Sequence, residues 1–359
     1  MRDYTGKIVY LGIDVHKITY SVTAICDGAV VKRDKLEASP QKFINYCFRY
    51  FKGAVLKSAY EAGFSGFYLH RFLIANGIEN IVVHAASIEI SARDTVKTDK
   101  RDSLKIATQL STNRLRAIHI PSEYREDKRN LTRLRENFVR QKTRIGCQIK
   151  SLLYLHNLQP DSLTQRVSRR WIDSLKKLST TKNLKYTIEN YSKLWQFFDF
   201  QLKEVEKKIQ EEMLSEMDLK LIYCSVPGIG DKAANILINE LGDTLQFTNE
   251  EKLFSHTGLT PREYSSGEHK RQGHISRQGK PILRRVLVQA AWKAIKQDQS
   301  LQSIFEKITQ RAGKKRASVA IARILFSRIR SCIKRKGLYL MEVVPKENER
   351  SLSLCRRAE

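Results

Sequence analysis

The chain has 359 residues, of which 41% are hydrophobic, enough for two or three folded domains and too many for a disordered polymer. Its 65 Lys and Arg outnumber its 38 Asp and Glu by 27, an excess that a small-molecule enzyme does not need and that indicates a polyanionic partner. Nucleic acid is favoured over an anionic membrane, because no stretch approaches the roughly 20 apolar residues of a membrane-spanning helix.

The N-terminus has no long apolar segment followed by a cleavage site, so we expect a cytoplasmic protein. The cysteines form no C-x-x-C pair, which argues against a zinc site and a disulfide framework and predicts reduced thiols. They stand at positions 26, 47, 147, 224, 332 and 355.

Strand and helix patterns alternate over the first 85 residues. Asp27 and Gly28 predict a hairpin turn between two of the strands. The predicted strands are 7–15, 18–25, 29–36, 54–61 and 80–85, and the predicted helices are 40–50 and 67–77. This order predicts a mixed sheet with helices packed on it, in the α/β class.

Asp14 stands inside an otherwise apolar predicted strand, where an unpaired carboxylate costs on the order of several kcal/mol. We therefore expect a positive group beside it. Glu61 closes another strand, and Asp99 and Asp102 lie three residues apart on one face of a helix. Four such oxygen donors suit two Mg²⁺ or Mn²⁺ ions, which can stabilise the attacking and leaving oxygens of phosphoryl transfer.

Each carboxylate also has a simpler interpretation. Asp99 and Asp102 could be a helix N-cap and its capping-box partner, and Glu61 could be a surface residue at a strand end. Asp14 has few structural reasons to exist, and the four acids together in so basic a chain favour a metal site.

Two long amphipathic helices follow, one over 123–156 and one carrying Trp195 to Met213. They predict a coiled-coil hairpin over 121–218, either within one chain or between subunits. A dimer contact is favoured, because neither helix has another obvious partner for its apolar stripe.

The C-terminal region, 219–345, is predicted to be helical. Gly228, Ile229 and Gly230 join two helical stretches as in a helix-hairpin-helix motif, whose backbone N–H groups can bind a phosphate. A plain tight turn is the alternative interpretation.

A loop rich in glycine, serine and cations follows this motif. Ser265 and Ser266 offer hydroxyl groups that could attack phosphorus. The cations predicted to neutralise phosphate around them are Lys270, Arg271, Arg277, Arg284 and Arg285.

The segment 307–341 contains no acidic residue. Ile321, Leu325 and Ile329 give it the apolar stripe of a helix. Arg328 and Arg330 are predicted to contact nucleic acid, since a basic run with no acid to balance it more often follows a phosphate backbone than faces water.

Several runs of residues resemble the DEDD family of insertion-sequence transposases. The N-terminal runs are "GIDVHK", "YEAGFSGFYLH" and "KTDKRDSLKIA", and the C-terminal runs are "PGIG", "GLTPREYSSG" and "GHISRQGKPILRRVL". The resemblance implies a RuvC-like, RNase H type domain over 1–120 and a C-terminal transposase domain over 219–345. The two amphipathic helices predict the dimerisation hairpin between them, over 121–218, and 346–359 is left as a tail.

The same resemblance implies a mechanism. Asp14, Glu61, Asp99 and Asp102 would cooperate with a serine nucleophile, and the serine directly before the glycine is Ser266, with adjacent Ser265 left open. It further implies a prokaryotic, nucleoid-associated multimer, dimeric or tetrameric, that recombines DNA under the guidance of a structured non-coding bridge RNA.

Two rival functions stay open on the residues alone. One is a structure-specific endonuclease that hydrolyses branched DNA with water and the four carboxylates. The other is a non-enzymatic nucleic-acid-binding scaffold that uses only the turn and the basic segments.

Overall fold

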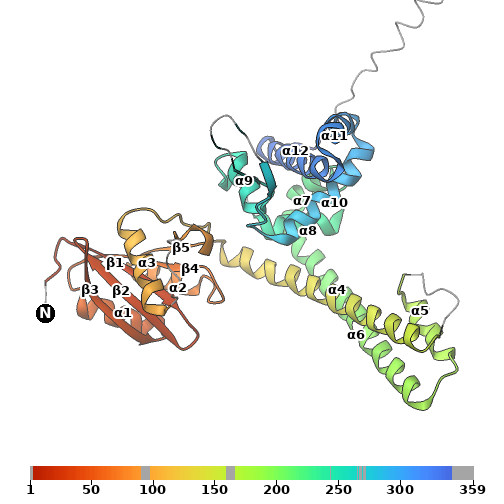
Figure 1. Cartoon of the computed structure of the whole chain (residues 1–359), viewed down its shortest axis with the longest axis horizontal. Helices are drawn as coiled ribbons and strands as arrows, with labels where there is room; N and C mark the ends of the chain where they lie inside the picture. The colour runs from red at the N-terminus through yellow and green to blue at the C-terminus, as the bar shows by residue number, and fades with distance from the viewer. Residues whose placement is uncertain are drawn as a thin grey trace, which may run out of the picture. The chain divides into compact units, whose positions relative to one another are not determined.

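The computed structural model describes residues 3–89, 98–158, 166–242, 244–264, 266, 269 and 272–341. The chain separates into two compact units, Met1–Pro121 and Ser122–Glu359 (Figure 1). The first boundary lies within one residue of the predicted domain end at 120. The second unit holds both the predicted hairpin and the predicted C-terminal domain, so the boundary at 218 stays a prediction; the tail 346–359 lies outside the described residues.

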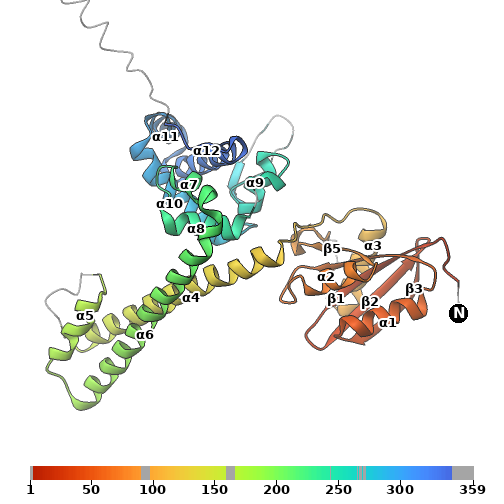
Figure 2. The same ribbon diagram turned by 180° about the vertical axis from the view of Figure 1, so that it is seen from behind.

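A five-stranded mixed sheet forms the centre of the first unit, in the order β3-β2-β1-β4-β5 (Figure 2). Its strands are β1 (Ile8–Val15), β2 (Thr19–Cys26), β3 (Ala29–Glu37), β4 (Val55–Glu61) and β5 (Glu79–Val83). β1, β2 and β3 pair antiparallel, whereas β4 and β5 continue the sheet in parallel beside β1. Asp27 and Gly28 turn between β2 and β3 with φ angles of 50° and 77°, the signs that a type I′ hairpin turn requires.

Three helices cover this sheet: α1 (Pro40–Tyr50), α2 (Tyr68–Ala75) and α3 (Asp99–Ser111). α1 and α2 pack on one face, where Phe43 and Leu73 are fully buried (Figure 2). α3 packs on the other face, where Ile106 joins Ala59 in a separate apolar cluster. The predicted α/β sheet domain is confirmed, and α3 carries the two helix acids to the sheet.

Two long helices begin the second unit: α4 (Glu123–Leu155) and α6 (Lys182–Glu212), with the short α5 (Arg169–Ser174) between them in sequence. α4 and α6 pack antiparallel, because Arg135 pairs with Glu206 at 2.8 Å while Lys142, further along α4, pairs with the earlier Asp199 at 2.5 Å. The two predicted long helices are confirmed as a hairpin within one chain.

The apolar stripes of this hairpin are buried inside the chain. Ile149 of α4 and Trp195 of α6 form one cluster with Trp171 and Ile172 of α5. The argument that neither helix has another partner for its stripe is therefore wrong, because α5 packs on both. The dimer contact itself stays a prediction. What α6 leaves exposed includes large side chains such as Phe197, whose side chain is 53% exposed.

Helices dominate the rest of the second unit. They are α7 (Met217–Cys224), α8 (Asp231–Leu241), α9 (Glu250–Thr257), α10 (Pro281–Gln297), α11 (Gln299–Ala312) and α12 (Lys314–Arg335). Leu237, Leu287 and Leu325 are fully buried in their common core. The predicted stripe of α12 is confirmed, since Ile321 and Ile329 are fully buried as well.

A short antiparallel hairpin interrupts these helices, where the sequence predicts only a loop. It consists of β6 (Pro261–Glu263) and β7 (Gln272–Ile275), paired through Pro261 with Ile275 and Glu263 with Gln272. Strands of three and four residues are too short to show an alternating pattern, which is why the sequence does not indicate them.

A buried carboxylate ties α4, α8 and the start of α10 together. Glu240, 1% exposed, accepts from Arg133 Nε at 2.8 Å and pairs with Lys280 Nζ at 2.9 Å. Burial alone would raise the pKa of Glu240, but the Arg133 hydrogen bond and the Lys280 charge lower it below its usual value. The carboxylate is therefore held ionised inside the domain.

Within the described ranges, no helix combines the length and the apolar character needed to cross a membrane. The described cysteines are free thiols, as predicted: Cys26, Cys47, Cys147, Cys224 and Cys332. Cys355 lies outside the described residues.

Candidate active site

Two of the predicted carboxylates end neighbouring parallel strands. β1 and β4 are in register up to the pair Ile13 and Tyr60, so the next residues, Asp14 and Glu61, stand side by side at the carboxyl ends of their strands. Asp14 is half-buried and Glu61 is exposed. The sheet thus brings together two acids that are 47 positions apart in sequence.

The other two carboxylates arrive on α3, which lies unusually close to β1. A Cβ on Gly12 would lie 2.9 Å from the Ala107 Cα and closer still to the Ser103 carbonyl oxygen and the Ala107 amide nitrogen. Thr23 and Ser103, both buried, hydrogen-bond through their hydroxyl groups at 2.9 Å. The absence of a side chain at Gly12 therefore lets the helix backbone rest on the strand that carries Asp14.

His16 completes a cluster with Asp14 and Asp99. Its Nε2 lies 3.1 Å from Asp14 Oδ2 and 3.3 Å from Asp99 Oδ1, and one ligand atom from each residue lies within 4.8 Å of the others. The side chain in contact with Asp14 is thus a histidine two residues along the same chain segment, which is a nitrogen donor and not a permanent cation. From the sequence, His16 is named only as part of "GIDVHK" and has no predicted role. Its position two residues after Asp14, at the end of a predicted strand, could have indicated a contact between the two side chains.

The electrostatics of the cluster differ from one acid to the next. Burial raises the pKa of Asp14, and the charges of Asp102 and Asp99 raise it further against the lowering effect of His16. A hydrogen bond from Lys35 at 3.3 Å lowers the pKa of Asp99. Lys105 Nζ lies 3.4 Å from Asp102 Oδ1. Ionised Asp14 is therefore poorly compensated by the protein itself, which is the condition that a bound cation would relieve.

This donor set fits a hard divalent cation. Carboxylate oxygens are the preferred ligands of Mg²⁺ and Mn²⁺, and one imidazole nitrogen is compatible with Mn²⁺. Asp14 and Asp99 lie in the three-residue cluster, while Glu61 and Asp102 flank it on β4 and α3. A metal-binding role for all four acids stays a prediction.

The predicted nucleophile lies on the β6–β7 hairpin. Ser266 is exposed and pairs with His269 through two backbone hydrogen bonds of 3.2 Å, which form an isolated bridge between the two strands. Ser265, Lys270 and Arg271 lie outside the described residues. Nothing described decides between the two serines.

Comparison with known proteins covers both units. A transposase model of the DEDD type named for IS110 matches residues 11–157, and a model described as "Transposase IS116/IS110/IS902 family" matches residues 222–306. This chain is a member of the IS110-type transposase family. The two matches include, respectively, the four carboxylates and the β6–β7 hairpin.

The chain is similar to proteins of several bacteria that are named as transposases. The chain is 26% identical to the transposase for insertion sequence element IS1533 of Leptospira borgpetersenii, over 79% of this chain and 85% of that one. It is 23% identical to the transposase for insertion sequence element IS1111A of Coxiella burnetii, over 88% and 86%. The putative transposase y4qE of Sinorhizobium fredii is 27% identical over 81% of this chain and 73% of its own.

In this transposase the predicted helix-hairpin-helix turn packs inward. Gly228 has φ of 86°, and a Cβ there would lie 2.5 Å from the Ala290 carbonyl oxygen of α10. Ile229 is buried, whereas Gly230 is exposed at the start of α8. Close packing against α10 is sufficient to explain Gly228, so phosphate binding by this turn stays a prediction.

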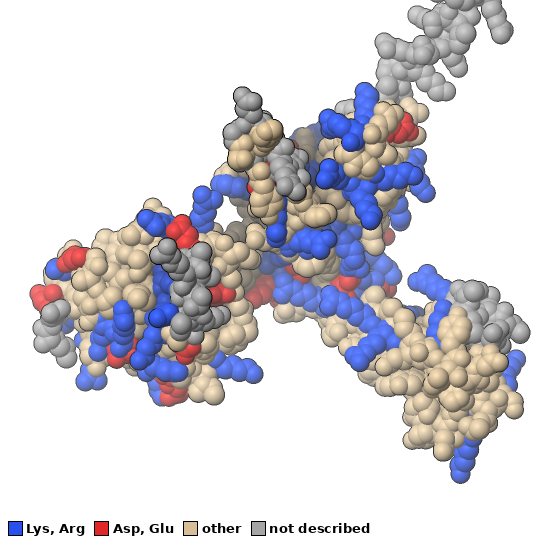
Figure 3. Space-filling model, viewed as in Figure 1, with Lys and Arg blue, Asp and Glu red and all other residues tan. Residues whose placement is uncertain are grey.

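Lys and Arg gather over the C-terminal helices on the face shown in Figure 3. Arg277, at the end of the serine loop, is exposed, and its φ of 56° is uncommon for a residue with a side chain. Four more of the arginines predicted to contact nucleic acid lie in the described ranges and donate to groups within the protein: Arg284 to the Thr257 and Gly279 carbonyls at 3.0 and 2.9 Å, Arg285 to Glu136, Arg328 to Asp298 at 3.1 Å, and Arg330 to the Phe247 carbonyl at 2.7 Å.

Proposed function

We propose that this insertion-sequence transposase cuts and rejoins DNA by metal-assisted phosphoryl transfer, with Asp14, Glu61, Asp99 and Asp102 as metal ligands. The observation that carries the proposal is the arrangement of the three elements that hold the acids. The parallel strands β1 and β4 end side by side, and α3 rests directly on β1. Such a site needs acids on separate elements held by backbone contacts rather than by side-chain flexibility.

When bound there, two Mg²⁺ or Mn²⁺ ions would stabilise the attacking and leaving oxygens of the phosphodiester. Asp14 is the central ligand, because it is the most buried of the four and belongs to the strand on which α3 packs. His16 orients the Asp14 carboxylate through its 3.1 Å contact. Lys35 and Lys105 hold Asp99 and Asp102 through contacts of 3.3 and 3.4 Å.

Ser266 is the proposed nucleophile. Its Oγ forms a bond to phosphorus as the bond from phosphorus to the departing DNA oxygen breaks; the serine proton passes to solvent and the departing oxygen takes one up. Rejoining reverses these bonds with a new strand. A phosphoserine link preserves the energy of the phosphodiester, which attack by water would lose, so no energy-rich cofactor is needed.

Two partners are proposed on the resemblance to bridge-RNA-guided recombinases. One is a structured guide RNA, with which the net charge of +27 is compatible. The other is a second copy of the chain, for which exposed apolar side chains of α6, including Leu194, Phe197 and Phe200, provide surface. A prokaryotic, nucleoid-associated location follows from the same proposal.

Trapping of a covalent intermediate tests the mechanism. Wild-type protein with target DNA, guide RNA and Mg²⁺ should form a protein–DNA adduct that Ser266→Ala cannot form, while the matched variant Ser265→Ala still forms it. An adduct that maps to Ser265 would reassign the nucleophile. Cleavage with free ends and no adduct in any variant would indicate a hydrolytic nuclease, and no cleavage at all a non-enzymatic scaffold.

A further inference from the structure

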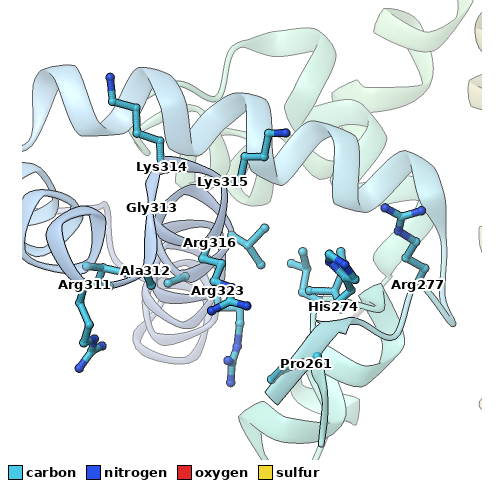
Figure 4. A pocket seen from close by; sticks show the side chains of 16 residues that line it. Pro261, His274, Arg277, Arg311, Ala312, Gly313, Lys314, Lys315, Arg316 and Arg323 are labelled. Carbon is cyan, nitrogen blue, oxygen red and sulfur yellow. The ribbon is translucent and has the colours of Figure 1, made fainter. Parts of the chain in front are cut away.

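A groove of about 1260 Å³ lies between the β6–β7 hairpin and the corner where α11 meets α12. His274 and Arg277 stand on one side, and basic side chains from the end of α11 and the start of α12 stand on the other (Figure 4). Among the residues that the structure describes, no acid lines the groove. Its cations are Arg277, Arg311, Lys314, Lys315, Arg316 and Arg323.

Acids of the described residues do not neutralise these cations. Across the described ranges, no acidic side chain pairs with any of the six, whereas Arg285 and Arg328 of the same region each pair with a buried acid. The guanidinium of Arg323 lies 4.6 Å from the centroid of the Phe254 ring, and its Nε is buried without a hydrogen-bond partner among the described residues. An anion in the groove would meet a guanidinium group that no acid of the described residues neutralises.

The first turn of α12 carries cations, whereas the first turn of a helix usually favours acidic residues. Lys314, Lys315 and Arg316 occupy its first turn, where the positive end of the helix dipole disfavours cations, and no acid accompanies them there. The N-cap residue, Gly313, offers no side chain to the free N–H groups. A sequence that breaks a local rule at such a place commonly does so for a ligand.

Partly exposed apolar side chains also line the groove and narrow the choice of ligand. They are Ile308 of α11 and Val319 of α12. A duplex keeps the faces of its bases stacked on one another and would leave this apolar surface unused, whereas a single strand can lay the faces of its bases on apolar side chains while its phosphates meet the cations.

We propose that this groove holds a single-stranded segment of nucleic acid, an inference that rests on the proposed function. The β6–β7 hairpin provides one wall of the groove through His274 and carries Ser266 towards its tip. A strand bound against this wall is therefore held by the same hairpin that presents the nucleophile. DNA and RNA share the phosphodiester chemistry that the cations recognise.

Salt-dependent binding tests the groove separately from catalysis. Full-length protein is titrated in EDTA, where metal-dependent chemistry is absent, with labelled oligo(dT), oligo(rU) and a duplex of about ten residues. The measured quantity is the slope of the logarithm of the binding constant against the logarithm of the salt concentration. For a single strand this slope should become shallower by about 2 in the triple variant Lys314→Gln, Lys315→Gln, Arg316→Gln, from three lost phosphate contacts at roughly 0.7 each. Its matched control replaces three exposed lysines off the groove by Gln: Lys252, Lys307 and Lys334.

The control should lower the salt slope by less than half as much. If the two triple variants lower the salt slope equally, or the Lys314, Lys315 and Arg316 variant leaves it unchanged, the proposal is overturned. If that variant loses as much affinity for the duplex as for a single strand, the assignment to a single strand is overturned. Whichever of oligo(dT) and oligo(rU) loses more affinity is the strand held, and equal losses support recognition of the shared backbone. The first variant should melt at or above the wild-type temperature, since it removes cations from a helix N-terminus, and Arg311→Gln should give a smaller loss of about 0.7 in slope.

Discussion

Replacing Asp14 by Asn should stabilise the metal-free transposase while removing its response to metal. The Asp14 side chain is only 21% exposed, its pKa is raised by burial and by two neighbouring acids, and Asn keeps an oxygen that can accept from His16. A raised carboxyl pKa means that ionisation opposes folding, and each tenfold change in the ionisation constant corresponds to about 1.4 kcal/mol. We therefore expect Asp14→Asn to raise the free energy of unfolding at pH 7 by about 1 kcal/mol.

The sign of the pH dependence follows from the direction in which the pKa moves. Because the folded pKa of Asp14 lies above its unfolded value of 3.8, the wild type is most stable below that value and loses this contribution as the pH rises through the folded pKa. The difference between Asp14→Asn and wild type should therefore be absent at low acid pH, appear as the pH rises above about 4 and be complete near neutrality.

Urea unfolding with and without Mg²⁺ measures both the stability of the metal-free protein and the stability that the metal adds. At a Mg²⁺ concentration about 100-fold above its dissociation constant, the wild type should gain about 2.7 kcal/mol, and Asp14→Asn should gain almost none. A variant that is less stable than wild type in EDTA, or that still responds fully to Mg²⁺, would refute the electrostatic account of the site.

Three further predictions concern the supports of the site and the chemistry. Gly12→Ala should destabilise the first unit by about 1–3 kcal/mol and abolish cleavage, since its methyl group would displace the backbone of α3. The control Gly63→Ala, whose new methyl group would lie 3.9 Å from the Glu61 carbonyl oxygen, should change the free energy of unfolding in urea by less than about 0.5 kcal/mol. Equal losses in the two variants would contradict the argument that α3 touches Gly12. Asp102→Asn should lose strand cleavage in a gel assay yet bind nucleic acid like wild type, and cleavage near the wild-type rate would exclude Asp102 as a ligand. Glu240→Gln should cost roughly 3 kcal/mol in urea unfolding, because it leaves Lys280 and Arg133 without their carboxylate; a loss under about 1 kcal/mol would mean that the ion pairs contribute little.

Much of the sheet domain could be predicted because its signals are local. Alternation defines β1 to β5, the Asp27–Gly28 turn sets the first hairpin, and a carboxylate in an apolar strand marks Asp14. The closeness of α3 to β1 could not be predicted, because it depends on Gly12 meeting Ser103 across the sheet and no local pattern reports such a contact. His16 escapes sequence reasoning for a related reason: its second acid, Asp99, is distant in sequence.

For the cations of the C-terminal region, the sequence shows the residues but not their contacts. Composition correctly identifies a basic region, but a count of cations cannot tell which of them have partners in the fold. Arg328 meets Asp298, and Arg330 meets a main-chain carbonyl, whereas Lys314 and Arg316 in the same helix have no acidic partner within the described residues. That distinction depends on which side of α12 faces the core and which faces the groove.

The hydroxyl pair of Thr23 and Ser103 joins positions separated by 80 residues, and this separation sets an order of assembly. Strands β1, β2 and β3 are linked by short turns and can form as soon as they leave the ribosome, whereas α3 is synthesised last of the helices in its unit. A nascent chain that ends before α3 has the strand acids Asp14 and Glu61 without the helix acids. We expect the four carboxylates to be complete only once α3 has joined the sheet, and cutting of DNA by the proposed mechanism to wait further until the hairpin that carries Ser266 has been synthesised.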